Sequence, residues 1–248
     1  MLRGRAARGT FAGALIFLVC GVSAGSAASS LVPVSCVVEL FTSQGCAFCP
    51  PADALLASLG RRQDVAAISF PVDYWDYIGW KDTLASPANA ARQRAYAGAM
   101  GEHHAYTPQA IVNGVAGAVG SDRKEIETAM SATRGRDGAM SLGLRAGVVD
   151  GSVVVDVPEG AGGPAVVLLI RVARQMSVQI GRGENAGRRI AYTNVVRQIS
   201  DLGVWSGAAA SFHAPDARAE GEGYVVLVQR GSQGRPGAIL AAAKSAGF

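Results

Sequence analysis

Two cysteines separated by two residues, Cys46 and Cys49, constrain this chain more than any other feature. An apolar run at residues 36–41 precedes them and predicts a buried strand, and residues 52–59 follow with the apolar spacing of a helix. A thiol at the first turn of a helix lies among unpaired backbone N–H groups at the positive end of the helix dipole. Both effects favour the thiolate, which is the reactive form of cysteine. The context therefore indicates a redox-active pair.

The two cysteines are expected to have different roles. Cys46 is predicted to be the exposed nucleophile, and Cys49 the buried thiol that resolves a mixed disulfide. An inert structural disulfide and a metal pair are the alternative interpretations. Cys36 begins the preceding strand, so we expect it at the end far from the motif, as a small buried apolar residue.

Residues 1–28 have the pattern of a secretory signal peptide. Arg3, Arg5 and Arg8 form a basic start, and residues 11–22 form an apolar core that is short for a membrane span. Small residues around Ala27 and Ala28 offer cleavage sites. The mature protein is therefore expected to be exported, to the periplasm or the medium. An uncleaved anchor is the alternative.

Composition excludes one class of partner. Removing the three signal arginines from the 23 basic residues leaves 20, against 19 acidic residues, so the mature chain is nearly neutral. No basic stripe argues for nucleic acid, and no later stretch is long and apolar enough for a transmembrane helix. We expect no nucleic-acid partner and no membrane contact after signal removal. Three cysteines remain, and an exported compartment permits disulfides.

The first half of the mature chain alternates strand and helix. A second strand is predicted at 65–70, and a helix at 86–100 with Ser86 as N-cap. Asn113-Gly114 between two β-compatible runs predicts a hairpin, and Ser121 is expected to cap a last helix ending near residue 132. The order β-α-β-α-β-β-α around Cys-x-x-Cys predicts a thioredoxin-like α/β domain over residues 31–138.

From residue 139 the helical periodicity disappears. Short valine-rich runs separated by turn signals such as Asp150-Gly151 predict about six strands. Their spacing favours an all-β, sandwich-like second domain over residues 139–248.

Several residues near the motif are candidates for site roles. Glu39, within the first strand, is a candidate proton acceptor for Cys49; the alternative is a surface carboxylate or one paired with a lysine. Trp75 and Trp80 lie in an aromatic loop after the second strand, which could form a substrate-facing rim, a packed cover over the core, or both at once. His103 and His104 could meet the thiols around a metal, but exposed loop histidines are far commoner, so no metal site is assigned.

Motifs along the mature chain resemble a family of secreted bacterial thioredoxin-like proteins of unknown function. The resemblance rests on Cys46-x-x-Cys49-Pro-Pro-Ala-Asp and on four later motifs: Val72-Asp73-Tyr74-Trp75-Asp76, Tyr106-Thr107-Pro108-Gln109, Gly183-Glu184-Asn185 and Asn194-Val195-Val196-Arg197. It implies the fold and export, but no established reaction. Pro71 departs from the pattern, where a histidine is expected. In thioredoxin-like proteins the proline before the hairpin is cis and faces the thiols, which implies that Thr107 and Pro108 pack against Cys46 and hold a substrate chain.

The sequence thus predicts an exported thiol–disulfide oxidoreductase acting through Cys46 and Cys49 without a cofactor or metal. Its expected partners are a protein or small-molecule thiol or disulfide and a redox partner protein. A non-catalytic thioredoxin-like binding module is the alternative function, and a copper-handling protein is a third.

Overall fold

The computed structural model describes residues 1, 2, 4, 29–102 and 104–248. The predicted signal peptide lies almost entirely outside these residues. Nine strands form one sheet and four form another. In order across the large sheet the strands are β2 (Val32–Pro33), β13 (Arg235–Lys244), β12 (Glu222–Ser232), β9 (Ala165–Gln179), β10 (Arg189–Trp205), β4 (Val65–Pro71), β3 (Cys36–Thr42), β5 (Gln109–Val112) and β6 (Ala116–Val119). The small sheet has the order β1 (Ser29–Ser30), β7 (Arg145–Val149), β8 (Ser152–Val157) and β11 (Ala210–Pro215).

The first half of the chain has the predicted order of elements. Helix α1 (Cys49–Gly60) connects β3 to the parallel strand β4, and α2 (Pro87–Met100) connects β4 to the antiparallel hairpin β5–β6. The Ser86 hydroxyl accepts a hydrogen bond from the Ala88 amide, as an N-cap does. Helix α3 (Arg123–Thr133) is capped by Asp122, whose carboxylate accepts from the Glu125 amide, and not by Ser121 as predicted. The aspartate lies one residue later and reaches the third helical amide.

The helices cover opposite faces of the first strands. Val38 and Leu40 of β3 pack with α1, whereas Val37 and Phe41 pack with α2. Successive side chains of a strand point to opposite faces, so this alternation assigns every residue of β3 to one helix or the other. Both faces of β3 are buried, which explains its near-continuous apolar sequence.

The small sheet packs against the strands of the second half. Val153, Val155 and Val157 of β8 share a core with Val167 and Leu169 of β9 and with the fully buried Trp205. These β9 residues alternate with Leu168 and Ile170, which belong to the core on the α2 side. Two stacked sheets thus bury the alternating valines of the second half.

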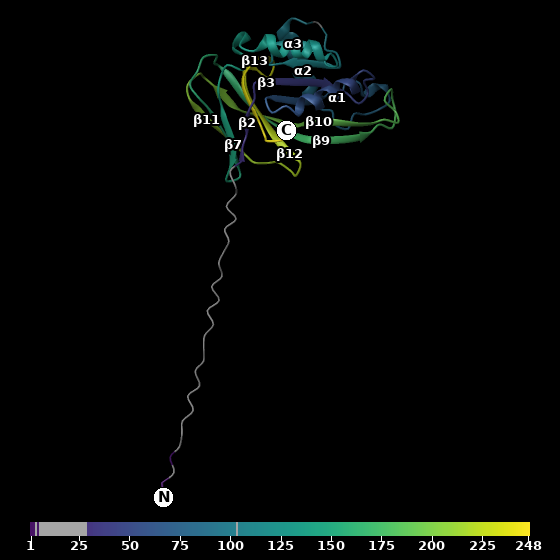
Figure 1. Ribbon diagram of the computed structural model, residues 1–248. Coiled ribbons are helices and arrows are strands. Elements are labelled where there is room, and N and C mark those ends of the chain that lie inside the picture. The colour runs from purple at the N-terminus through teal and green to yellow at the C-terminus, as the bar shows by residue number, and fades with distance from the viewer. Residues whose placement is uncertain (3, 5–28, 103) are drawn as a thin grey trace.

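Strand β10 joins the two halves of the chain. It pairs with β9 in an antiparallel ladder and with β4 in parallel, where Val195 is opposite Ser69. The segments 31–138 and 139–248, predicted as separate domains, therefore contribute to one continuous sheet. Figure 1 shows β9 and β10 as a long hairpin running alongside α1. Among the described residues, no helix is long and apolar enough to cross a membrane.

Candidate functional site

Cys46 and Cys49 form a disulfide at the start of α1. Their Cα atoms are 5.4 Å apart, and the Cys49 amide donates to the Cys46 carbonyl oxygen at 3.2 Å. Helix α1 begins at Cys49 with Phe48 as N-cap, so Cys46 lies in the loop before the helix rather than in its first turn. Cys36 is a free, buried thiol, and burial raises its pKa to about 12. A thiol with that pKa stays protonated near neutral pH and is unreactive.

Both cysteines of the disulfide are buried, which corrects the expectation of an exposed Cys46. Cys46 is 1% exposed and Cys49 is 0% exposed, whereas Phe48 between them is 78% exposed. The reason is that segments remote in sequence enclose the loop before the helix. A reagent cannot reach either sulfur in this conformation, although it can reach the Phe48 ring.

Three side chains hold this loop from outside. The Asn185 amide nitrogen, in the turn between β9 and β10, donates to the carbonyl oxygens of Gln44 and Cys46, both at 2.9 Å. The Asp82 carboxylate accepts from the Gln44 amide at 2.8 Å, and the Trp80 indole donates to the Gln44 side chain at 2.8 Å. Asn185 and Gln44 are fully buried, so these bonds are shielded from water. Trp80 thus anchors this loop of residues 43–48, the redox loop, and its expected place in a substrate-facing rim stays a prediction.

Trp75 connects the redox loop to the cis-proline segment. Its indole donates to the Thr107 hydroxyl at 2.7 Å, and a Cβ placed on Gly45 would lie 3.0 Å from the Trp75 Cβ. A side chain at position 45 would therefore displace Trp75. The Thr107–Pro108 peptide bond is cis. Tyr77, which is 81% exposed, stacks on Trp75 with the two rings 11° from parallel. Thr107 and Trp75 thus lie together beside the loop of Cys46.

Glu39 lies on the other face of the sheet from Cys49. It shares that face of β3 with Val37 and Phe41, towards α2, whereas α1 packs on the opposite face. Its buried carboxylate accepts from Arg92 Nε at 2.8 Å and from the Tyr96 hydroxyl. Glu39 is therefore neither at the surface nor paired with a lysine. Glu39 is thus one member of a buried structural ion pair, and it lies on the face of the sheet away from the helix that carries Cys49.

The buried acid next to the disulfide is Asp53, which sequence reasoning did not single out. It follows Cys49 by one helical turn, and residues at this spacing lie on the same face of a helix. The Thr42 hydroxyl donates to Oδ1 at 2.8 Å, but the buried Oδ2 has no partner among the described residues. Burial raises the pKa of Asp53 well above its ordinary value, because the low-dielectric surroundings favour the protonated, neutral form. An aspartate in the buried stripe of Ala52, Leu55 and Leu56 was the signal available in the sequence.

Tyr192 of β10 completes this buried polar cluster. Its hydroxyl is buried without a partner among the described residues. Burial raises the pKa of Tyr192, and the charges of Asp53 and Asp82 raise it further. The second half of the chain therefore contributes a hydroxyl to the environment of Asp53. Across the described residues there is no cluster of three or more His, Cys, Asp or Glu side chains that could hold a metal ion.

The sequence of residues 37–229 matches a family described as "Protein of unknown function (DUF1223)". The chain belongs to this family. The match runs from β3 into β12 and so contains the disulfide, Asp53, Tyr192 and the turn with Asn185. Both halves of the chain are thus part of the family unit.

A solved relative supports the same architecture. The DUF1223 chain is similar to the X-ray crystal structure of a protein from Agrobacterium tumefaciens determined by a structural genomics consortium. The two chains are 34% identical with a TM-score of 0.78, and the similarity covers 87% of this chain and 95% of the other. No curated protein matched the sequence.

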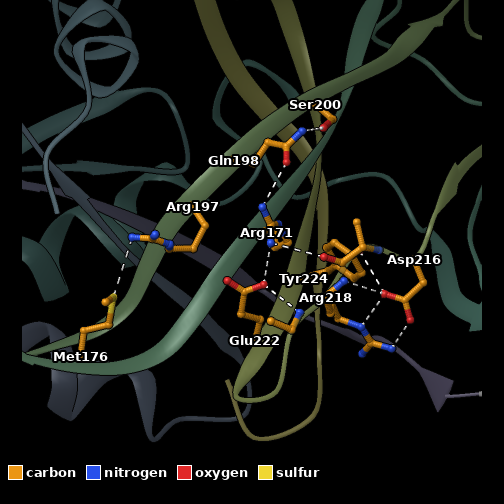
Figure 2. A network of polar contacts seen from close by, with 11 residues as sticks. Arg171, Met176, Arg197, Gln198, Ser200, Asp216, Arg218, Glu222 and Tyr224 are labelled. Carbon is orange, nitrogen blue, oxygen red and sulfur yellow. Dashed lines mark hydrogen bonds and ion pairs between the residues drawn. The ribbon is translucent and has the colours of Figure 1, made fainter.

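Other residues of the family motifs lie away from the disulfide. Arg197 is exposed on β10 and approaches the Met176 sulfur at 4.0 Å, as Figure 2 shows. Near it, Arg171 pairs with Glu222 at 2.7 Å, and Arg218 pairs with Asp216 at 2.7 Å. The first pair connects β9 to β12, and the second lies within the loop before β12; both are far in sequence from the loop of Cys46. We assign them a structural role.

Proposed function

We propose that this protein is a thiol–disulfide oxidoreductase that acts through Cys46 and Cys49. The observation that carries the proposal is the Cys46–Cys49 disulfide at the start of α1, with Trp75 connecting its loop to cis-Pro108. A thioredoxin-like first half is part of the proposal. It is supported by the order β4-β3-β5-β6, with β3 parallel to β4 and antiparallel to β5. Export after cleavage of residues 1–28 is proposed from the sequence pattern alone.

The proposed reaction is reversible exchange of two electrons. In the reduced protein, the Cys46 thiolate attacks a substrate disulfide, a mixed disulfide forms, and one substrate thiolate leaves. The Cys49 thiolate then attacks Cys46 Sγ, so the Cys46–Cys49 bond forms and the second substrate thiolate leaves. A thiol or dithiol of a redox partner reduces the protein again by the reverse steps. No cofactor enters this chemistry.

Asp53 is the group we assign to the proton of Cys49. When a partner thiolate attacks Cys46, Cys49 leaves as a thiolate in a buried environment, where a charge is costly. Asp53 lies one helical turn away, and its raised pKa favours the protonated form, which can give its proton to that thiolate. When Cys49 attacks in the opposite direction, the ionised Asp53 takes the proton back.

The burial of the disulfide has a consequence for the mechanism. Because Cys46 is 1% exposed, attack on its sulfur requires the covering segments to move. The bonds from Asn185, Asp82 and Trp80 to the redox loop oppose that movement. The rate of reduction is therefore expected to depend on how easily this loop opens.

The test is turnover of a protein disulfide, such as those of insulin, by the mature chain with a dithiol reductant. Wild-type protein and Cys36→Ala are expected to accelerate the reaction equally, because Cys36 is protonated and separate from the disulfide. Cys46→Ser and Cys49→Ser should be inactive. If the wild type is no faster than these two variants, the oxidoreductase proposal is wrong.

Burial of both sulfurs also favours one second candidate, a binding module whose disulfide is structural. The reduction potential discriminates between the two functions. A structural disulfide typically lies below about −300 mV, and redox-active pairs lie between about −270 and −120 mV. A value in the lower range, together with no turnover, would favour the binding module.

A further inference from the structure

A cavity lies at the opposite end of α1 from the disulfide. Its volume is about 750 Å³, and it is formed by the C-terminal end of α1, the middle of the β9–β10 ladder and the segment after β13. The helix rises about 1.5 Å per residue, so the twelve residues of α1 place this cavity well away from the redox loop. The volume lies within the range of small-molecule sites, about 300–1,000 Å³.

The charged side chains of the cavity all have the same sign. They are Arg61, Arg62, Arg174 and Lys244, and no Asp or Glu side chain lines the cavity with them. Arg62 is paired with Asp64 at 2.8 Å, but no ion pair of the described residues includes the other three. The cavity therefore has an excess of positive charge.

Part of that charge serves the fold. Lys244 is 4% exposed, and its ammonium group donates to the carbonyl oxygens of Arg62 at 2.8 Å and Val65 at 2.6 Å. Arg61 donates to the Ala57 carbonyl oxygen at 3.4 Å. Cations at the end of a helix neutralise its free carbonyl groups. An ammonium group has three donors, so Lys244 keeps one after these two bonds, and no ion pair among the described residues includes it.

Arg174 has no such structural role. Arg174 is exposed, its guanidinium carbon lies 4.5 Å from the centre of the Phe248 ring, and none of the side-chain hydrogen bonds among the described residues includes it. Stacking fixes the plane of a guanidinium group and leaves its edge free for the two-point contact that carboxylates and phosphates make. Arg174 is thus held in position with its donors unused.

Asn194 adds an independent feature on the β10 side of the same cavity. It is 2% exposed, and its amide nitrogen donates to the Ala67 carbonyl oxygen at 2.9 Å. Its buried Oδ1 has no donor among the described residues. A buried acceptor without a donor is costly and is usually satisfied by a ligand or ordered water.

From these features we infer that the cavity between α1, β10 and the segment after β13 binds a small organic anion. The anionic group, a carboxylate or a phosphate, pairs with Arg174 and the free donor of Lys244. Ala57, Val32 and the Phe248 ring supply apolar surface for a small apolar body. This site is separate from the disulfide, so the inference does not depend on the proposed redox function.

The experiment titrates the full mature chain, with its disulfide intact, with phenyl phosphate, benzoate and inorganic phosphate. Calorimetry measures affinity, and the side-chain amide signal of Asn194 in nitrogen-correlated NMR spectra reports the location. We expect saturable binding of phenyl phosphate, benzoate or both, stronger than that of inorganic phosphate, with a shift of the Asn194 signal. The preferred probe identifies the anionic group.

Variants test the assignment to Arg174. Arg174→Gln should weaken binding at least tenfold, and Arg174→Lys should fall between it and the wild type, because lysine keeps the charge but loses the two-point contact. Arg94→Gln, at an exposed position on α2, is the matched control and should bind as the wild type does. No saturable binding of any probe would overturn the inference. Equal weakening in Arg94→Gln and Arg174→Gln would also overturn it, since it would show only nonspecific attraction to a basic surface.

Discussion

The side-chain amide of Asn185 lies 2.9 Å from the carbonyl oxygen of Cys46, although 139 residues separate them in sequence. This bond connects the tip of the β9–β10 hairpin to the redox loop of the first half. It gives the second half of the chain a direct influence on the disulfide.

Replacing Asn185 by alanine should free the redox loop. The change removes two buried hydrogen bonds, leaves the Gln44 carbonyl group unpaired and removes one of the two donors to the Cys46 carbonyl group, at a cost of about 1–3 kcal/mol in the free energy of unfolding. Reduction of the disulfide by dithiothreitol should become several-fold faster, because the loop opens more easily. Glu184→Ala, at the exposed neighbouring position, is the control and should leave both quantities unchanged. An unchanged reduction rate in Asn185→Ala would show that this bond does not limit access.

Replacing Asp53 by asparagine should change how stability depends on pH. The folded protein holds the Asp53 proton more tightly than the unfolded chain does, because the folded pKa is raised above 3.8. Stability from this group is therefore present below pH 3.8 and is lost as pH rises towards the folded pKa, at about 1.4 kcal/mol per pH unit. Asp53→Asn removes this loss. Chemical denaturation should show the variant gaining stability relative to wild type as pH rises above 3.8, and Asp150→Asn at an exposed turn should show no such trend.

The buried pair of Glu39 and Arg92 should respond asymmetrically to mutation. Arg92→Met leaves the Glu39 carboxylate buried without its cation and should cost about 3–5 kcal/mol of stability. Adding Glu39→Gln should recover part of that loss, because the remaining group is then neutral. A double-mutant cycle by urea denaturation measures the coupling. Redox activity of the folded Glu39→Gln variant should be retained, and its loss would restore Glu39 as a candidate proton acceptor.

The pair of Asp216 and Arg218 in Figure 2 should stabilise the protein only above acidic pH. The bonds from Arg218 lower the pKa of Asp216 to about 2. The stabilisation is complete above the ordinary value of 3.8 and is lost as pH falls towards 2. Asp216→Asn should therefore destabilise the protein at pH 7, by no more than about 1 kcal/mol because the pair is partly exposed to solvent. The wild type and the variant should become equal near pH 2, as measured by thermal unfolding.

Local patterns in the sequence predicted the elements of the first half well. The apolar run before Cys46 gave strand β3, and Ser86 with Pro87 located the start of α2. These signals depend on neighbours within a few residues. Strand β11 was missed because half of its residues are exposed and its length is short.

Contacts between distant segments could not be predicted in the same way. The burial of Cys46 depends on Asn185 and on the loop that carries Trp80, and no local pattern shows that these segments meet there. The face of the sheet on which Glu39 lies depends on its position along β3, because side chains alternate between the two faces. The sequence left this face open, since the spacing between Glu39 and Cys46 was uncertain by one loop residue. Asp53 could have been identified from the sequence, since an acid one turn after Cys49 on the buried face of α1 is a local signal.

The pairing of β4 with β10 also bears on the order in which the chain can fold during synthesis. Strand β4 ends at Pro71, but its partner on one side, Val195, is made more than a hundred residues later. Until then, the backbone N–H and C=O groups along one edge of β4, beside Ser69, have no partner strand to bond with. An open strand edge is a site for incorrect pairing. The half that carries the disulfide is therefore complete only when the second half has been made. A fragment ending at residue 138 should expose that edge and aggregate.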